Sequence, residues 1–431
     1  MSATGQVDRP ARADVRADVA IVGGGLTGQL LALTLSHVFD GALSVVVVDR
    51  DDAGSGEKRP PSDVRASALS AGPHRLLAQL GLWPQIDAHA QPVHRIEITD
   101  SSLGDAVRPV VLRYDNTVEE SPASFIVPNS ALTAACAAAL AARADIHLLR
   151  GQVVDVTRTP TQARVVLADG RHVRADLIAA CDGARSQQRK SAGIGVVGAS
   201  HGQSGIVTSV ALEHDHGGTA VQHFLPGGPF AILPLKENRA CITWSEDDVE
   251  AARLMQADAA TFEAALRARI GTRYGVVKVD GPRATWPLAT AIARQISALR
   301  LVLVGDAAHG VHPIAGQGLN LAIRDIAALA EALAQAMALG LDAGHMTILS
   351  RYQAWRRFDG TVSAATFAGL NALFSNDLVF LRMLRDAGLG AVERLPMLKR
   401  VLVSEAAGLN GDVPALLRGE PIDFKADAGH A

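Results

Sequence analysis

A glycine-rich turn near the start of the chain restricts its fold more than any other feature. Residues 17–22 form an apolar run typical of a buried strand, and residues 23–28, Gly-Gly-Gly-Leu-Thr-Gly, follow it directly. A helical pattern comes next, and a second strand, residues 43–48, ends at Asp49 about 20 residues beyond the last glycine. Strand, glycine turn, helix, strand and terminal acid in this order are typical of a dinucleotide-binding α/β unit. We therefore expect the glycines to lie against a pyrophosphate and Asp49 to bind a ribose.

The same glycine spacing occurs again at residues 193–198, Gly-Ile-Gly-Val-Val-Gly. Here the polar residues 187–190, Gln-Gln-Arg-Lys, stand where the leading strand should be. The pattern needs a strand before it and a helix after it, so we expect no second nucleotide-binding unit at this place. Any nicotinamide donor would then bind without a Rossmann unit of its own.

Residues 301–325 hold a second cofactor-type pattern. The apolar residues 301–304 predict a strand buried on both faces, and Asp306 follows at its carboxyl end, where open α/β sheets place ligand groups. A glycine loop leads to a helix predicted from near Leu319, whose positive N-terminal end would face the loop. Carboxylate, loop and helix end together suit a polyol attached to a ring that becomes anionic, such as a flavin. The alternative is an ordinary strand–loop–helix with a structural aspartate. Asp182-Gly183 ends a further buried strand and is a third signal of this kind.

Charge and cysteine content exclude several classes of protein. The 41 basic and 44 acidic residues give a net charge of −3, so no basic excess indicates nucleic acid as a partner. Cys136, Cys181 and Cys241 are widely separated without metal-type spacing, which favours reduced thiols and no metal site. The N-terminus lacks the apolar segment of a signal peptide, and no apolar run is long enough to span a bilayer. We expect a cytoplasmic protein that can contact the inner membrane face as a peripheral protein.

The three motifs in this order resemble those of the class A flavoprotein monooxygenases. The resemblance is closest to the UbiH and UbiF family of FAD-dependent ubiquinone-biosynthesis hydroxylases. The matched segments extend over nearly the whole chain and include Arg65–Ser70, Phe224–Leu235, His312–Leu321 (His-Pro-Ile-Ala-Gly-Gln-Gly-Leu-Asn-Leu) and Arg351–Gly419.

The resemblance implies an α/β fold with three parts. A Rossmann-like FAD-binding domain would comprise residues 17–92, 120–195 and 286–345. An inserted mixed β-sheet substrate domain would comprise residues 93–119 and 196–285. Residues 346–431 would form a C-terminal helical region.

The resemblance also assigns residues to the cofactor. The glycines would hold the pyrophosphate, Asp49 the adenosine ribose, and Arg65 the phosphates, although Arg65 fits a solvated helix-flanking arginine equally well. Asp306 would bind the ribitol, Asp182-Gly183 would brace the cofactor and the route of the electron donor, and the loop before the helix would lie at the isoalloxazine. The complete set expected to bind FAD is Gly23, Gly25, Gly28, Asp49, Arg65, Asp182, Gly183, Asp306, Pro313, Gly318, Leu319 and Asn320.

No catalytic base can be assigned from the sequence. His201 stands where the family often has tyrosine, and the three tyrosines of the chain lie in none of the three cofactor motifs, so activation of a phenol by paired tyrosines is not visible. His312 and Pro313 are candidates for a catalytic role. His309 and His312 are each more readily explained as loop-structuring residues than as proton donors.

The implied reaction is the hydroxylation of an aromatic ring. One oxygen atom of O2 would enter a polyprenyl phenol or benzoquinol intermediate of ubiquinone biosynthesis through a flavin C4a-hydroperoxide, with electrons from NAD(P)H or a ferredoxin-type donor. Other ubiquinone-biosynthesis proteins are possible partners. The mixed apolar and basic residues 373–402 fit peripheral membrane contact, and they fit equally a helix whose apolar residues pack on the FAD domain or against another biosynthetic protein. Two alternatives remain open: an FAD-dependent isoprenoid double-bond reductase, and a non-catalytic prenyl-protein escort with an FAD fold.

Overall fold

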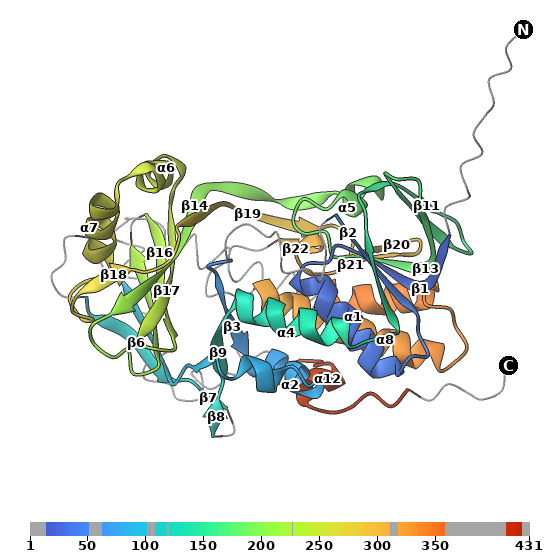
Figure 1. The fold of residues 1–431 in the computed structure, drawn as a ribbon, viewed down its shortest axis with the longest axis horizontal. Coiled ribbons are helices and arrows are strands. Elements are labelled where there is room, and N and C mark those ends of the chain that lie inside the picture. The colour runs from blue at the N-terminus through green and yellow to red at the C-terminus, as the bar shows by residue number, and fades with distance from the viewer. Residues whose placement is uncertain are drawn as a thin grey trace, which may run out of the picture.

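A computed structural model of the chain describes residues 14–50, 63–100, 103, 108–118, 120–225, 227–310, 318–357 and 411–424. Two large β-sheets lie toward opposite ends of an elongated molecule, and two long strands run between them (Figure 1). This mixed α/β arrangement agrees with the fold class expected from the sequence.

The first sheet has eight strands around a parallel centre. Its path is β10-β2-β1-β13-β12-β11, and β21 joins β13 on one side and β20 on the other. The neighbours β10, β2, β1, β13 and β21 are parallel, whereas β12, β11 and β20 join by antiparallel pairs. The strands are β1 (Val15–Val22), β2 (Val45–Asp49), β10 (Ile146–Arg150), β11 (Val153–Arg158), β12 (Ala163–Leu167), β13 (His172–Ala180), β20 (Ser297–Ala298) and β21 (Leu301–Leu303).

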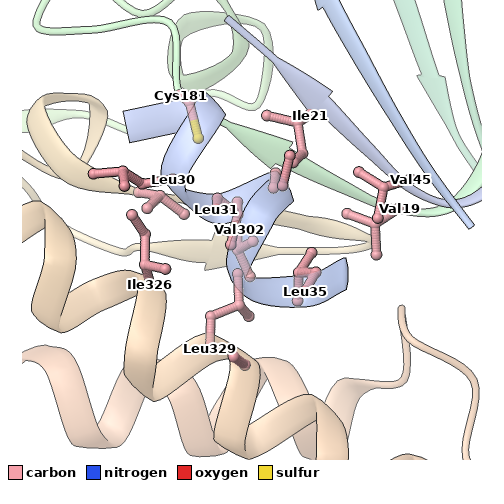
Figure 2. Packing of buried hydrophobic residues seen from close by; sticks show 14 of the residues in the cluster. Val19, Ile21, Leu30, Leu31, Leu35, Val45, Cys181, Val302, Ile326 and Leu329 are labelled. Atoms are coloured by element: carbon pink, nitrogen blue, oxygen red, sulfur yellow. The ribbon is translucent and has the colours of Figure 1, made fainter. Parts of the chain in front are cut away.

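A helical layer covers this sheet and supplies most of its core. Helices α1 (Leu26–Phe39), α4 (Asn129–Ala141) and α8 (Gly318–Met337) lie side by side below the sheet in Figure 1, and α1 contacts both of the others. Figure 2 shows how Leu31 of α1 meets Val302 of β21, with Ile326 and Leu329 of α8 beside them. All four side chains are buried, so the apolar runs expected as buried elements do form the core.

The second sheet has nine strands and is mostly antiparallel. Its path is β22-β19-β14-β17-β16-β15-β5-β6, and β18 also pairs with β14. The strands are β5 (Arg95–Asp100), β6 (Val110–Asp115), β14 (Val196–Leu212), β15 (Thr219–Leu225), β16 (Gly228–Leu235), β17 (Arg239–Asp247), β18 (Val277–Val279), β19 (Ala284–Ala293) and β22 (His309–Gly310). One face packs against helices α6 (Asp248–Gln256) and α7 (Ala259–Ile270). The other face packs against a small three-stranded sheet formed by β3 (Ala66–Ser70), β9 (Ser124–Pro128) and β4 (Gln91–Pro92).

The remaining elements are short. They are β7 (Thr117–Val118), β8 (Ser121–Pro122), α2 (Ala71–Gln79), α3 (Trp83–Ile86), α5 (Gln187–Ser191), the 3-10 turn η1 (Gly305–Ala307), the helical residues 346–357, and α12 (Ala415–Arg418), which packs on α2. None of the helices in the described part of the chain is both long enough and apolar enough to cross a membrane. Residues 373–402, which suggested membrane contact, lie outside the described residues.

The strands β14 and β19 connect the two sheets. They pair over most of their length, from Val196 opposite Ala293 to Val207 opposite Ala284. The domain boundary expected at residue 286 falls inside β19, and the division into domains stays a proposal. The second glycine pattern, residues 193–198, lies where α5 ends and β14 begins. It therefore lacks the strand-before-helix context of a nucleotide-binding turn, as the sequence predicted.

Candidate functional site

Gly23, Gly25 and Gly28 of the first glycine turn have different surroundings. Gly23 has φ +107°, and a Cβ there would lie 2.4 Å from the carbonyl oxygen of Cys181 in the neighbouring chain segment. A Cβ on Gly28 would lie 1.9 Å from the carbonyl oxygen of Gly23, so a side chain would push α1 away from its own strand. A Cβ on Gly25 would meet no atom of the described residues within 4 Å. The packing of these residues therefore does not require a glycine at position 25, whereas a ligand approaching the backbone would.

The N-terminus of α1 is suited to an anion. Gly25 is its N-cap residue and makes no side-chain cap, and the first turn contains no acidic residue. The first N–H groups of a helix have no partner within the helix, and the helix dipole makes this end positive. Asp49 lies beside the turn, where its Oδ2 accepts a hydrogen bond of 2.5 Å from the N–H of Gly24. A helix end suited to a phosphate, with an acid beside it at the end of β2, is the arrangement of a dinucleotide site.

Asp306 lies at the carboxyl end of β21, within the turn η1. Gly305 before it has φ +64°, and a Cβ there would lie 3.0 Å from both Thr27 of α1 and Ala322 of α8, so this turn fits closely between two helices. The Asp306 side chain reaches solvent, and its Oδ1 would be 3.9 Å from a Cβ placed on Gly318, the first residue of α8. Asp306 is thus directed to the start of α8.

The surroundings of Asp306 change its acidity. Desolvation by the surrounding protein atoms raises the pKa of the Asp306 carboxyl, although the side chain itself reaches solvent. Arg65 and His309 act against this rise, and the charge of Asp325 adds to it. The exposed Asp306 carboxylate can accept a hydrogen bond from a ligand hydroxyl group.

The Asp182-Gly183 loop is braced by the short helix α5. Oδ2 of Asp182 accepts hydrogen bonds from the N–H groups of Gln187 (2.7 Å) and Gln188 (3.1 Å). Oδ1 of Asp182 is buried and has no hydrogen-bond partner among the described residues. Gly183 has φ +77°, a conformation that favours glycine.

Arg189 connects this loop to the Asp306 turn, a role that the sequence did not indicate. Its guanidinium donates from Nη2 to the carbonyl oxygen of Ala184 and from Nη1 to that of Ala307, both at 2.8 Å. Arg189 is buried. The sequence holds no local signal for the contact with Ala307, because the two residues are 118 positions apart along the chain.

Arg65 reaches the same region from the start of β3. It forms an ion pair of 2.7 Å with Asp63, and its guanidinium lies 5.0 Å from the ring centre of Trp286 in β19. It is close enough to Asp306 for each charge to affect the pKa of the other. The side chain remains half-exposed, so the structure is compatible with both expectations for Arg65, phosphate binding and a solvated arginine.

The residues expected at the flavin ring are only partly described. Gly318 and Leu319 begin α8, while Asn320 donates from Nδ2 to the carbonyl oxygen of Ala68 (2.7 Å) and accepts from the N–H of Ser70 (3.2 Å). The amide of Asn320 therefore holds the start of α8 against the junction of β3 and α2. His312 and Pro313, the candidates for catalysis, lie outside the described residues.

Two further histidines can be placed. His201 lies in β14, with Nε2 at 2.9 Å from Oγ1 of Thr290 in β19. His309 is buried, with Nε2 at 3.4 Å from Oδ1 of Asp325. The role expected for His309 in structuring the loop stays a prediction. In the described part of the chain, no group of three or more potential ligands could hold a metal ion.

Comparison with known proteins decides which cofactor this site takes. Residues 16–359 match the model of a family described as FAD binding domain. The chain belongs to this family. Its cofactor is FAD, and the steric requirements of the glycine turn, the uncapped positive end of α1 and the Asp306 turn all fit that group.

Relatives extend the match over the whole chain. Ubiquinone hydroxylase UbiL of Rhodospirillum rubrum is 40% identical over 432 residues, which cover 98% of this chain and 96% of that protein. The 3-demethoxyubiquinol 3-hydroxylase of Escherichia coli is 35% identical, with 91% of this chain and 98% of that protein covered. Among solved structures, p-nitrophenol 4-monooxygenase PnpA from Pseudomonas putida has a TM-score of 0.76 at 20% identity and covers 93% of this chain and 100% of that one. At this identity, the last likeness shows the fold alone.

Proposed function

We propose that this protein is an FAD-dependent monooxygenase that hydroxylates the aromatic ring of a polyprenyl phenol or quinol intermediate of ubiquinone biosynthesis. The main support is the similarity, over nearly its whole length, to hydroxylases that are named for ubiquinone intermediates. The convergence of the glycine turn, the Asp182 loop and the Asp306 turn at one edge of the first sheet supports the same function.

In this proposal, the three motifs hold different parts of FAD. Gly25 and the N-terminus of α1 bind the pyrophosphate, and Asp49 accepts from the adenosine ribose. Asp306 accepts from the ribityl hydroxyls. The positive end of α8 stabilises negative charge on the ring system. Bound FAD supplies the chemistry that transfers electrons from the donor to dioxygen.

The second sheet supplies a surface for the substrate. Trp286 in β19 is 37% exposed and lies under the guanidinium of Arg65, whose charge also acts on Asp306. An indole held in this way offers a flat, apolar surface, and such a surface suits an aromatic ring. We infer that Trp286 orients the substrate ring. We assign the role of a catalytic base to no residue.

The test is product analysis with FAD-loaded protein, NAD(P)H and a short-chain polyprenyl phenol under isotopically heavy dioxygen. We expect a product that gains one labelled oxygen atom, together with substrate-stimulated oxygen uptake. A product that gains two hydrogen atoms would identify a double-bond reductase. Absence of both product and oxygen uptake, with every candidate phenol, would favour the non-catalytic escort.

Two variants make this test more specific. Trp286→Leu removes the flat surface and should raise KM for the phenol by about tenfold without changing FAD affinity. Gly195→Ala is the matched control, because its new Cβ would lie no closer than 3.5 Å to the side chain of Arg294. An unchanged KM in Trp286→Leu would contradict the role given to the indole.

Access to a substrate that resides in the bilayer requires contact with a membrane or a carrier. We propose a transient peripheral contact through residues 373–402, where large apolar residues are mixed with basic ones. Flotation with anionic liposomes at low and high salt tests this proposal, because headgroup attraction weakens as ionic strength rises. If neither wild type nor Lys399→Glu/Arg400→Glu floats under any condition, delivery by a partner protein replaces it.

A further inference from the structure

The turn that carries Asp306 lies against one buried carboxylate on α8, Asp325. Oδ2 of Asp325 accepts a hydrogen bond of 2.9 Å from the N–H of Gly305, immediately before Asp306. Oδ1 of Asp325 faces Nε2 of His309 at 3.4 Å, three residues after Asp306. Between these ends, Arg189 donates to the carbonyl oxygen of Ala307. The backbone before Asp306 is therefore bonded to Asp325 and the backbone after it to Arg189, while the His309 ring lies close to the same Asp325 carboxylate.

Arg356, from the helical residues 346–357, completes this cluster. Its Nε donates to Oδ1 of Asp325 at 2.7 Å, and both side chains have no exposed surface. Tyr352 of the same helical segment donates to the carbonyl oxygen of Leu303 at 2.8 Å, so the segment also contacts the strand that leads into the turn. Desolvation alone would raise the pKa of Asp325, but His309 and Arg356 outweigh it and keep that pKa lowered.

A buried charge is a costly way to hold a helix against a sheet. The other residues that α8 turns inward are mostly Ala, Ile and Leu, which would pack there without a desolvation cost. Asp325 does what an apolar side chain cannot do, because it accepts from the backbone N–H next to Asp306 while Arg356 balances its charge.

We propose that Asp325 is a positioning residue for the cofactor. It fixes the backbone at Gly305, immediately before Asp306, so that the Asp306 carboxylate is directed at the start of α8, and Arg356 holds the other oxygen of Asp325 in place. The proposal rests on the assignment of Asp306 to the ribityl chain of FAD. The carboxylate of Asp325 itself has no surface exposed to a ligand.

The second sheet contains a matched ion pair that separates positioning from stability. Glu246 and Arg269 are also buried and joined at 2.8 Å, but they lie between β17 and α7, far along the chain from the cofactor motifs. If Asp325 contributes only stability, Asp325→Asn and Glu246→Gln should have the same consequences.

The experiment measures FAD affinity by titration of the purified apoprotein, and the visible circular dichroism of bound flavin, for wild type and four variants. Asp325→Asn should weaken FAD binding by about tenfold and alter the flavin dichroism, because an amide cannot accept from Gly305 and Arg356 together. Glu246→Gln should lower the melting temperature while FAD affinity stays within about twofold of wild type. Arg356→Lys, which keeps the charge, should lie between wild type and Asp325→Asn.

The fourth variant, Asp306→Ala, separates failure of this proposal from failure of the assignment on which it rests. Wild-type FAD affinity in Asp306→Ala would remove the ribityl assignment and, with it, the positioning role. Weakened binding in Asp306→Ala together with wild-type affinity and dichroism in Asp325→Asn would overturn the positioning role alone. If Asp325→Asn does not fold, Arg356→Lys decides: weaker binding with altered dichroism supports the proposal, and wild-type values overturn it.

Discussion

Residues 23–28 and 193–198 share one spacing of glycines and have opposite surroundings. The first set connects β1 to α1, so a strand leads in and a helix leads out. The second set connects the short helix α5 to β14, so the order is reversed. Only the first arrangement directs the N–H groups of a helix toward a ligand beyond the end of a strand.

The reasons for glycine also differ between the two regions. A Cβ on Gly28 would come within 1.9 Å of the Gly23 carbonyl oxygen, and a Cβ on Gly198 would come within 1.8 Å of the Thr290 carbonyl oxygen. The first close approach brings a helix onto its own strand, whereas the second brings β19 against β14. The comparison shows that a glycine pattern records close backbone approach, and only the flanking elements reveal whether a ligand is involved.

The largest effect is expected from Gly28→Ala. The methyl group would clash with the Gly23 carbonyl and with Ile21, so α1 must move away from β1. We expect a loss of about 3 kcal/mol in the free energy of unfolding, together with purification of the protein without FAD. Urea unfolding and visible flavin absorbance measure the two effects. A yellow Gly28→Ala protein with wild-type stability would show that the first turn is not the one described.

Gly198→Ala should be the next most harmful change, but only for stability. The methyl group would clash with backbone atoms of Thr290, and the pairing of β14 with β19 would have to shift. We expect a loss of about 2 kcal/mol in the free energy of unfolding. FAD affinity of the folded protein, measured by titration, should change by no more than about twofold. Strong loss of FAD with little loss of stability would assign a cofactor role to the second pattern.

Gly25→Ala should show the reverse behaviour. The added methyl meets no atom in the part of the chain that the structure describes. The cost in stability should therefore be only about 0.5–1 kcal/mol, because alanine is a poor N-cap residue. FAD affinity should fall by about tenfold, since the pyrophosphate approaches the backbone at this glycine. Titration of the apoprotein gives the affinity, and thermal unfolding of the same sample is the control. Unchanged affinity would place the pyrophosphate elsewhere.

The smallest effect is expected from Gly195→Ala. Its methyl group would make only ordinary contact, at 3.5 Å, with the flexible side chain of Arg294. Stability should stay within about 0.5 kcal/mol of wild type, and the affinities for FAD and for the nicotinamide donor should be nearly unchanged. A selective loss of nicotinamide affinity in steady-state kinetics would mean that residues 193–198 bind the donor after all.

Much of the fold could be predicted because its signals are local. Strands β1, β2, β13 and β21 appear in the sequence as short apolar runs, and each is followed by a glycine or an acid at its carboxyl end. The helix predicted from near Leu319 begins at Gly318. The assignment of individual residues to parts of FAD stays a prediction, and so does the division into domains.

The supporting contacts of the site could not be predicted. Arg189 meets the Ala307 carbonyl across 118 positions of sequence, and Arg65 meets Trp286 from another sheet. No periodicity or motif records such contacts, because each depends on how separate elements pack. Asp325 gave no signal of its role, since one acidic residue in a helix is usually a solvated one.

The sequence by itself determined the βαβ unit, the family and the positions of the three cofactor motifs, because glycine sterics and buried apolar runs act between residues close along the chain. Only the tertiary structure decided which buried charges serve those motifs. The Asp306 turn receives its supports from α5, from α8 and from the helical residues 346–357. A buried carboxylate is tolerated only where donors from several elements converge on it, and that convergence exists only in the folded chain.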